Sequence, residues 1–569
     1  MTTRFAAPTV ADPRVPAYPD TAPGVDSAGI RGGETWESRR RDRERPNVAP
    51  GPWESEILAR LKKPECLICR EGADTLARYY FWFLNEQYAS VPAVDRLRRA
   101  RGFCLRHSRH LVAWRAPDQT CTVAGYVLRA CNDWLHTLRA AETSERTRSA
   151  SPPERLQPAA PCPACENERE AVSRYAWALA ECLKRPEVAS SYRASYGLCF
   201  PHFLEAAPLA GWETLQCLVA EQIRHLEDAR AALTAVRDWR MDGHGVAALR
   251  EARKRLHGQD LDTRIRPFLA APRGRGDAQT APIRDREVTE AAPFAHWSPA
   301  FEETRGLLDQ PGCSLCRVAA RGREEYVTWL EEEIRTCAAD EYRWDQTQYL
   351  CAEHAWLVAD RCDPQVLAIA CDVGLGKAAA CLRELQEAIR DPIHPRLAGR
   401  VLALPARWQE TGRPEPPVTA RPHLAQRIRR TLQGLWLTPT VVLRRARERA
   451  LWRNACPLCR HLETIVGRAA DRLIAVLGDP EGWRAFGASY GLCLRHAPLL
   501  LERAHDPALR RGIADVLRAR VEVGCWEAEE FLRKQSWSVR HEPRGAEQTA
   551  WLRATARIAG MLDETGYAL

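Results

Sequence analysis

Apolar residues recur at helical spacing along most of this chain. Four long stretches carry them three or four positions apart, over residues 122–142, 212–239, 365–390 and 507–534. This spacing places apolar side chains on one face of an α-helix. Alternation of apolar and polar residues rich in Val, Ile and Thr, which is typical of strands, is scarce. The pattern therefore predicts an all-α fold with short loops.

Four cysteine-rich cassettes lie between these helical stretches. Each has a Cys-x-x-Cys pair and then a Cys-x-x-His pair, and 34, 33, 34 and 33 residues separate the second Cys from the third. Agreement within one residue in all four indicates a repeated unit. The cassettes are Cys66, Cys69, Cys104 and His107; Cys162, Cys165, Cys199 and His202; Cys313, Cys316, Cys351 and His354; and Cys456, Cys459, Cys493 and His496.

The alternation of 34 and 33 residues indicates that two kinds of cassette take turns. The second and fourth cassettes share Cys-Pro at the first pair and the string Ala-Ser-Tyr-Gly-Leu-Cys, at residues 194–199 and 488–493. Both also have a Pro-Glu dipeptide upstream, at Pro186 and Pro480. We therefore expect an A-B pair that has been duplicated into A-B-A-B.

Changes in composition suggest where these units begin and end. Stretches rich in Pro, Arg and Gly are typical of tails and linkers. We expect a disordered N-terminal tail over 1–52, repeat A1 over 53–141, repeat B1 over 155–240, a linker over 241–296, repeat A2 over 297–390, a linker with a basic amphipathic segment over 391–445, and repeat B2 with a C-terminal tail over 446–569.

The residue types of each cassette predict a structural zinc site. Zinc prefers four tetrahedral thiolate and imidazole ligands, and three Cys with one His supply them without water. Cys and His three residues apart share a helix face, and a helix start favours thiolates. We expect four Zn²⁺ ions, one in each cassette. The third site is the weakest, because Tyr349 replaces the Gly of the other cassettes and Glu353 adjoins His354.

Other prominent residues of the cassettes have a simpler interpretation. Tyr79, Tyr175 and Tyr326 each lie ten residues after a Cys-x-x-Cys pair, and they and the nearby Trp82 and Trp329 are expected to pack in a core. The cysteines outside the cassettes are spaced irregularly, and we interpret them as buried free thiols. They are Cys121, Cys131, Cys182, Cys217, Cys337, Cys362, Cys371, Cys381 and Cys525.

Composition indicates the cellular compartment of the protein and whether it spans a membrane. The 569 residues include 21 Cys, carry a net charge of +9 and are 45% hydrophobic. The N-terminus lacks the apolar segment of a signal peptide, and apolar runs are too short to span a bilayer. Many cysteines in a long chain without an export signal indicate metal binding. We therefore expect a cytoplasmic protein without a transmembrane segment.

The cassette motif resembles that of a known family. Cys-Pro-x-Cys with Gly-Leu-Cys-x-x-His before long helices is similar to an uncharacterised family of bacterial cytoplasmic proteins, classed as a domain of unknown function. The C-terminal string over residues 538–560 also resembles the tail of that family. The resemblance covers the four cassettes and this tail. It implies metal binding and a helical fold, and no activity comes with it.

Three functions remain open from the sequence. The first is a non-enzymatic scaffold with structural zinc and an unidentified protein partner, because a closed Cys₃His site has no open position and no HExxH, P-loop or GxSxG motif is present. The second is nucleic-acid binding through the Arg-rich segment 421–453, with Arg427, Arg429, Arg430, Arg444, Arg445, Arg447 and Arg449. The third is a redox sensor whose zinc-bound thiolates are oxidised and then release the metal.

Overall fold

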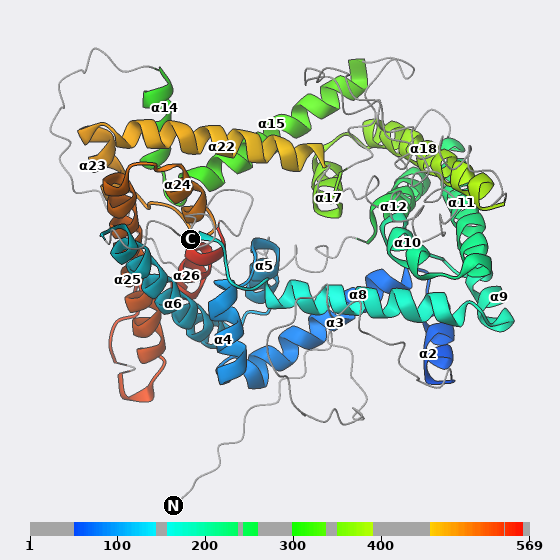
Figure 1. The fold of residues 1–569 in the computed structure, drawn as a ribbon, viewed down its shortest axis with the longest axis horizontal. Helices are drawn as coiled ribbons and strands as arrows, with labels where there is room; N and C mark the ends of the chain where they lie inside the picture. The colour runs from blue at the N-terminus through cyan, green and yellow to red at the C-terminus, as the bar shows by residue number, and fades with distance from the viewer. Residues whose placement is uncertain are drawn as a thin grey trace, which may run out of the picture. The chain divides into compact units, whose positions relative to one another are not determined.

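The structure, a computed structural model, confirms the all-α prediction. It describes residues 51–143, 156–236, 243–259, 299–336, 350–390, 456–539 and 541–560, and these form helices with no strand among them (Figure 1). From Gly51 onward the described residues belong to one compact unit.

The helices of the first half follow the order expected for one A unit and one B unit. Repeat A1 contains α2 (Gly51–Leu61), α3 (Leu67–Trp82), a π-helical turn (Phe83–Gln87), α4 (Val91–Ala100), α5 (Leu105–Ala113) and α6 (Pro117–Thr143). Repeat B1 contains α8 (Pro163–Cys182), α9 (Pro186–Ala194), α10 (Phe200–Ala206), a 3₁₀ turn (Ala207–Leu209) and α11 (Trp212–Thr234), and α12 (Gly243–His257) follows it.

The second half has the same order of long and short helices. Repeat A2 contains α14 (Pro299–Leu308), α15 (Ser314–Thr336), α17 (Ala352–Arg361) and α18 (Pro364–Arg390). Repeat B2 contains α22 (Pro457–Leu477), α23 (Pro480–Ala488), α24 (Ala497–Arg503), α25 (Pro507–Arg533), two 3₁₀ turns (Trp537–Val539 and Ala546–Thr549) and α26 (Ala550–Ala559). A long helix after Cys-x-x-Cys, a short one at Cys-x-x-His and another long one recur in all four repeats, which supports the A-B-A-B duplication.

Prolines explain why many of these helices begin where they do. Pro186 and Pro480, the first residues of the two repeated Pro-Glu dipeptides, are also the first residues of the equivalent short helices α9 and α23. Proline has no N–H to leave unpaired and its φ already suits a helix, so the first helical position favours it. In α23 and α25 the preceding residue completes the cap, since Asp479 accepts from Glu481 N at 2.8 Å and Asp506 accepts from Ala508 N at 2.9 Å.

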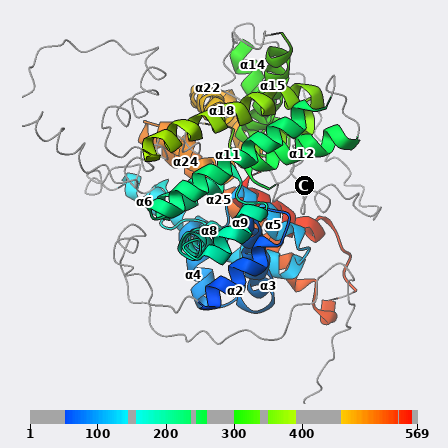
Figure 2. The same ribbon diagram turned by 90° about the vertical axis from the view of Figure 1, so that its right-hand side faces the viewer.

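The long helices pair between the two halves of the chain. Helix α6 of A1 packs along α25 of B2, and α11 of B1 packs along α18 of A2 (Figures 1 and 2). Within each half the helices after Cys-x-x-Cys pair with each other, α3 with α8 and α15 with α22. If each helix is replaced by its equivalent in the other half of the chain, the α6–α25 pair becomes the α18–α11 pair, and α3–α8 becomes α15–α22. The packing therefore has the twofold character that a duplication implies.

Two hydrophobic cores result from this pairing. Core 1 combines B1 and A2, where Phe203 and Leu226 join the same cluster as Leu375. Core 2 combines A1 and B2, where Leu128 joins the same cluster as Leu517. Neither core belongs to one half of the chain, so the repeats are not packed as four separate domains.

Four of the described helices contribute to both cores, and we call them the bridging helices. Each begins in one core and continues into the other, and the two members of each pair run in opposite directions. Helices α3 and α22 begin in core 1, with Leu67 and Leu458, and continue into core 2, with Tyr80 and Leu473. Helices α8 and α15 begin in core 2, with Ala164 and Leu315, and continue into core 1, with Leu179 and Leu330.

The structure differs from the expected linker over 241–296. Its first part forms α12, which packs against α10, α11, α17 and α18. Leu249, Ala252 and Leu256 are buried along one face of this helix. The Arg-rich composition hides this apolar stripe, because arginines flank it and two of them also pack inside the protein, Arg253 on Trp356 and Arg255 on Tyr196. In the other half α26 holds the equivalent place, against α5, α6 and α25, and Arg557 O of α26 accepts a hydrogen bond from Leu494 N just before α24.

Several other sequence predictions meet the structure only in part. The expected tail over 1–52 and linker over 391–445 lie outside the described residues, apart from Gly51 and Pro52, which begin α2. Tyr175 and Tyr326 are buried in the core as expected. Trp82 and Trp329 are not buried as expected, since they are 46% and 40% exposed. They lie on the outer faces of α3 and α15.

Helix α18 bears on the expectation that no segment spans a membrane. Among the described residues, its stretch Pro364–Glu387 is long and apolar enough to do so. Half of that stretch is buried inside the protein, against α11 and α12. The apolar composition of α18 is therefore accounted for by its place in core 1.

Candidate metal centres

The structure brings all sixteen cassette ligands together in four groups. Each group holds three cysteine sulfurs and one histidine nitrogen within 4.8 Å of one another. The groups are Cys66, Cys69, Cys199 and His202; Cys104, His107, Cys162 and Cys165; Cys313, Cys316, Cys493 and His496; and Cys351, His354, Cys456 and Cys459. Each is the Cys₃His set that a closed tetrahedral zinc site uses.

The pairing corrects the expectation of one zinc in each cassette. The Cys-x-x-Cys pair of A1 meets the Cys-x-x-His pair of B1, and the first pair of B1 meets the second pair of A1. The same exchange occurs between A2 and B2. Every group therefore joins an A unit to a B unit.

The length of the bridging helices explains the exchange. The helices that follow the Cys-x-x-Cys pairs have 16 to 23 residues, which corresponds to about 24 to 35 Å at the rise of an α-helix. Each carries the chain from one core into the other before the Cys-x-x-His pair is reached. A cassette's own second pair is therefore in the wrong core, and the antiparallel neighbour supplies the pair that is close.

Distances in the first group fit one tetrahedral zinc ion. The Sγ atoms of Cys69 and Cys199 are 3.6 Å apart, and the Nδ1 atom of His202 lies 3.5, 3.2 and 3.2 Å from the sulfurs of Cys66, Cys69 and Cys199. With zinc at about 2.3 Å from sulfur and about 2.0 Å from nitrogen, a tetrahedron has edges of about 3.8 and 3.5 Å. A disulfide would need a separation of about 2.05 Å, which excludes this pair.

The other three groups have the same dimensions. The Cys104–Cys165, Cys316–Cys493 and Cys351–Cys459 sulfurs are separated by 3.7, 3.7 and 3.9 Å. The histidine nitrogen that faces the sulfurs is Nδ1 in every group, at 3.2 to 3.6 Å. The Cys-x-x-His pair of the third cassette has the same geometry as the others, since Cys351 Sγ and His354 Nδ1 are 3.4 Å apart.

Helix starts position the sulfurs. The first cysteine of a Cys-x-x-Cys pair directly precedes α3, α8 and α22, as Cys66, Cys162 and Cys456. The cysteine of a Cys-x-x-His pair directly precedes α5, α10 and α17, as Cys104, Cys199 and Cys351. The fourth cassette departs from this, because a turn follows Cys493 and α24 begins after His496. A helix start presents free N–H groups and about half a positive charge, which stabilises thiolates.

Electrostatics within each group favours the thiolate form of one cysteine. The pKa is lowered for Cys66, Cys104, Cys313 and Cys456, and it is raised for Cys69, Cys165, Cys199, Cys351 and Cys493. Contacts with the Cys162 and Cys165 sulfurs lower the pKa of the Cys104 thiol, and contacts with Cys351 and Cys459 lower that of Cys456. Burial alone would lower the pKa of His107, but the Cys104 and Cys162 sulfurs raise it to about 11. Each group therefore places one favoured thiolate beside two further sulfurs and an imidazole, a set that could hold a metal ion.

One site has a carboxylate behind its histidine. Glu168 Oε2 lies 3.6 Å from Nε2 of His107, on the side of the ring away from the sulfurs. Arg106 holds this carboxylate with two hydrogen bonds of 2.7 and 2.9 Å. Burial opposes the charge of Glu168, but His107 and Arg106 lower its pKa to about 2. Carboxylates in this position orient metal-bound imidazoles.

The remaining cysteines form no further site among the described residues. Cys121, Cys131, Cys182, Cys362 and Cys371 are buried, as the sequence suggested. Burial raises the pKa of Cys131 and Cys371 to about 12, so both stay protonated and are poor metal ligands. Cys217 and Cys525 are half-buried, Cys381 is exposed, and Cys337 lies outside the described residues.

Sequence reasoning missed a layer of residues behind two of the sites. The backbone of Gly258 lies against the sulfurs of Cys69 and Cys199, and that of Gly560 lies against Cys316 and Cys493. Both glycines end the helices that follow repeat B, α12 and α26. A repeated Ala-x-x-Arg-x-x-Gly string, at 252–258 and 554–560, was the signal that could have found them.

The Arg-rich segment cannot be placed beside these sites. Residues 421–453, with all seven arginines named for nucleic-acid binding, lie outside the described residues. Comparison with known proteins adds no candidate function, since no family model, no curated protein and no solved structure matches this chain.

Proposed function

We propose that this protein is a non-enzymatic scaffold in which four structural Zn²⁺ ions hold two helical cores together. The exchanged pairing of ligands carries this proposal. Each ion fastens the start of a bridging helix from one repeat to the short Cys-x-x-His segment of another. Core 1 receives the starts of α3 and α22 in this way, and core 2 receives those of α8 and α15.

The chemistry of the groups supports zinc and a structural role. Three thiolates and one imidazole select zinc over hard cations such as Mg²⁺ and Ca²⁺, which prefer oxygen. Four protein ligands complete the tetrahedron, so no position is left for a substrate or a reactive water. A structural site contributes on the order of 10 kcal/mol of apparent binding free energy. Four such sites are sufficient to decide whether the cores stay joined.

An exposed apolar surface supports a protein partner for this scaffold. Val523 and Trp526 lie three residues apart on α25 and are 51% and 63% exposed, and Trp537 just beyond the helix is 76% exposed. Exposed tryptophans are enriched in protein interfaces. We propose further that the protein is cytoplasmic and belongs to the bacterial family that its cassettes resemble, since a reducing compartment keeps such thiolates available to zinc.

Metal analysis of the purified full chain tests this function. Protein prepared without chelators should contain close to four zinc ions per chain by inductively coupled plasma mass spectrometry. Removing them should lower the helical circular dichroism signal and the midpoint of thermal unfolding, and restoring zinc should recover both. A fully helical, cooperatively folded protein with less than one zinc per chain would overturn the proposal.

A further inference from the structure

The four metal groups fall into two pairs that the twofold repetition relates. One pair joins the first ligands of an A unit to the second ligands of a B unit. We call these the capped sites: Cys66, Cys69, Cys199 and His202, and Cys313, Cys316, Cys493 and His496. The other pair has the opposite combination. We call these the open sites: Cys104, His107, Cys162 and Cys165, and Cys351, His354, Cys456 and Cys459.

A glycine covers the sulfurs of each capped site. A Cβ atom added to Gly258 would lie 3.4 and 3.5 Å from the sulfurs of Cys69 and Cys199, and one added to Gly560 would lie 3.2 Å from that of Cys316. Both glycines have a positive φ, of 84° and 100°. Beyond the first glycine, the N–H of Gln259 donates to the Cys69 sulfur at 3.4 Å. We call each of these segments a cap.

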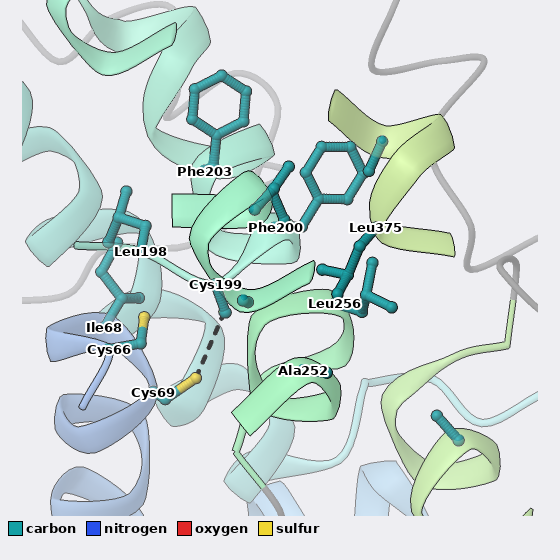
Figure 3. Packing of buried hydrophobic residues seen from close by; sticks show 14 of the residues in the cluster. Cys66, Ile68, Cys69, Leu198, Cys199, Phe200, Phe203, Ala252, Leu256 and Leu375 are labelled. Atoms are coloured by element: carbon teal, nitrogen blue, oxygen red, sulfur yellow. Dashed lines mark hydrogen bonds between the residues drawn. The ribbon is translucent and has the colours of Figure 1, made fainter. Parts of the chain in front are cut away.

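An arginine three residues earlier anchors each cap. The guanidinium carbon of Arg255 lies 3.5 Å from the centre of the Tyr196 ring, and that of Arg557 lies 3.4 Å from the centre of the Tyr490 ring. Each arginine also donates to the backbone oxygen of the same tyrosine. These tyrosines belong to the Ser-Tyr-Gly-Leu-Cys strings that lead into the capped ligands. Figure 3 shows Ala252 and Leu256 of α12 beside the Cys69–Cys199 pair.

Exposure of the cysteine residues differs between the two classes in the direction that the caps predict. All six cysteines of the capped sites are buried, and the most exposed, Cys316, reaches only 8%. In the open sites Cys104, Cys162, Cys165, Cys351 and Cys459 are partly exposed. The histidines show the opposite pattern, because His107 and His354 of the open sites are the buried ones. The open sites are therefore more exposed at their cysteines, and the capped sites at their histidines, His202 and His496.

We propose that the two open sites hold exchangeable zinc and that the two capped sites hold zinc that does not exchange on the same timescale. This inference rests on the proposed function, because it takes all four groups as zinc sites. An incoming ligand displaces a protein ligand by first approaching the metal as a fifth donor. The partly exposed thiolate side of an open site permits that approach. The cap and the buried sulfurs block it at a capped site.

The exchange is a ligand substitution without redox chemistry. Nitrogen and oxygen donors of a chelator form bonds to zinc while the three Zn–S bonds and the Zn–N bond to protein break. The released thiolates take up protons from water, and the chelate leaves with the ion. No oxidant or reductant enters the balance.

Release kinetics of the zinc-loaded full chain test the proposal. With excess 4-(2-pyridylazo)resorcinol at neutral pH, absorbance of the zinc chelate should rise in two phases. Two ions per chain should leave in the first phase and two at least tenfold more slowly. Release of all four ions in one phase, or a first phase that differs from two ions, would overturn it. Protein that holds no zinc at the outset would instead contradict the proposed function.

Alkylation assigns the phases to residues without any substitution. Brief treatment of the zinc-loaded protein with N-ethylmaleimide, followed by peptide mass spectrometry, should modify Cys104, Cys165 and Cys459 well before Cys69 and Cys316. Equal rates for both sets would count against two classes of site.

A substitution in one cap gives an independent check. Gly560→Ala places a methyl group against the Cys316 sulfur at a φ that only glycine adopts readily. One of the two slow ions should then leave in the fast phase. Gly306→Ala is the matched control, since an added Cβ at Gly306 has no neighbour within 4 Å and its φ is negative, and it should keep two ions in each phase. Unchanged kinetics in a folded Gly560→Ala protein would remove the cap from the explanation.

Discussion

Single glycines decide how closely the chain approaches its metal ligands. Gly197 and Gly491 are equivalent residues, two positions before Cys199 and Cys493, and their φ angles are 76° and 73°. Their surroundings differ. A Cβ atom at Gly197 would lie 2.5 Å from Nε2 of the buried His225, whereas one at Gly491 would have its nearest neighbour, Leu517 Cδ2, at 3.7 Å. The repeat therefore provides two sites with the same backbone strain and different packing.

Gly197→Ala is predicted to destabilise the protein more than Gly491→Ala. Both substitutions place an alanine in a left-handed backbone conformation, which lowers the free energy of unfolding by about 1–2 kcal/mol. Only Gly197→Ala adds a clash with His225, so its midpoint of thermal unfolding should fall further, by several degrees. In a His225→Ala background the two substitutions should have similar effects. Equal effects in the original background would show that His225 does not restrict this position.

The chemistry of His225 supports its role as a packing residue. Burial, with the nearby charges of Arg255 and Arg224, lowers its pKa to about 3. Its imidazole is therefore neutral at physiological pH and takes no proton that would open the contact with Gly197. The candidate metal-binding histidine His107 differs, because the neighbouring sulfurs raise its pKa to about 11.

At the scale of elements, α12 shows how a helix can be concealed by its composition. It lies where the Arg-rich sequence predicted a linker, yet its apolar face lies in core 1. Leu256 is 3% exposed on that face, and Val246 in the same helix is 41% exposed. A linker would tolerate changes at both positions equally.

Leu256→Ala is predicted to destabilise the protein strongly, and Val246→Ala is the control. Truncating a buried leucine costs about 2–5 kcal/mol, whereas an exposed position changes stability by less than about 0.5 kcal/mol. Thermal unfolding of both zinc-loaded variants, followed by circular dichroism, measures the difference. Similar midpoints for the two variants would mean that α12 does not contribute to the core.

The elements also show what the sequence could and could not predict. Helical spacing predicted α6, α11, α18 and α25 to within a few residues, because their apolar faces are long and regular. Spacing also identified the sixteen residues that the structure gathers into four groups. It did not predict the exchanged groups, because a Cys-x-x-Cys pair carries no local mark of the Cys-x-x-His pair that it joins. That choice depends on the length of the bridging helices and on which core each one enters.

At the scale of the whole molecule, the exchanged pairing makes the two repeats of each half depend on each other. The Cys69 and Cys199 sulfurs that share one site are 130 residues apart in the chain, and those of Cys316 and Cys493 are 177 apart. A metal ion bound at each site would close a long loop, and closing a long loop lowers the entropy of the unfolded chain more than closing a short one. An isolated cassette contains half of one site and half of another, so we expect no single cassette to bind zinc tightly.

Zinc content of paired cysteine variants distinguishes the exchanged sites from four independent cassettes. Cys69 and Cys199 belong to different cassettes but share one site, so Cys69→Ser with Cys199→Ser should remove about one ion, as either single substitution should. Cys69 and Cys104 belong to the same cassette but to different sites, so Cys69→Ser with Cys104→Ser should remove about two. Independent cassettes require the reverse, two ions for the first pair and one for the second. Because both variants carry two substitutions in the same half of the chain, general destabilisation cannot produce this difference, and the metal count reports the connectivity of the fold.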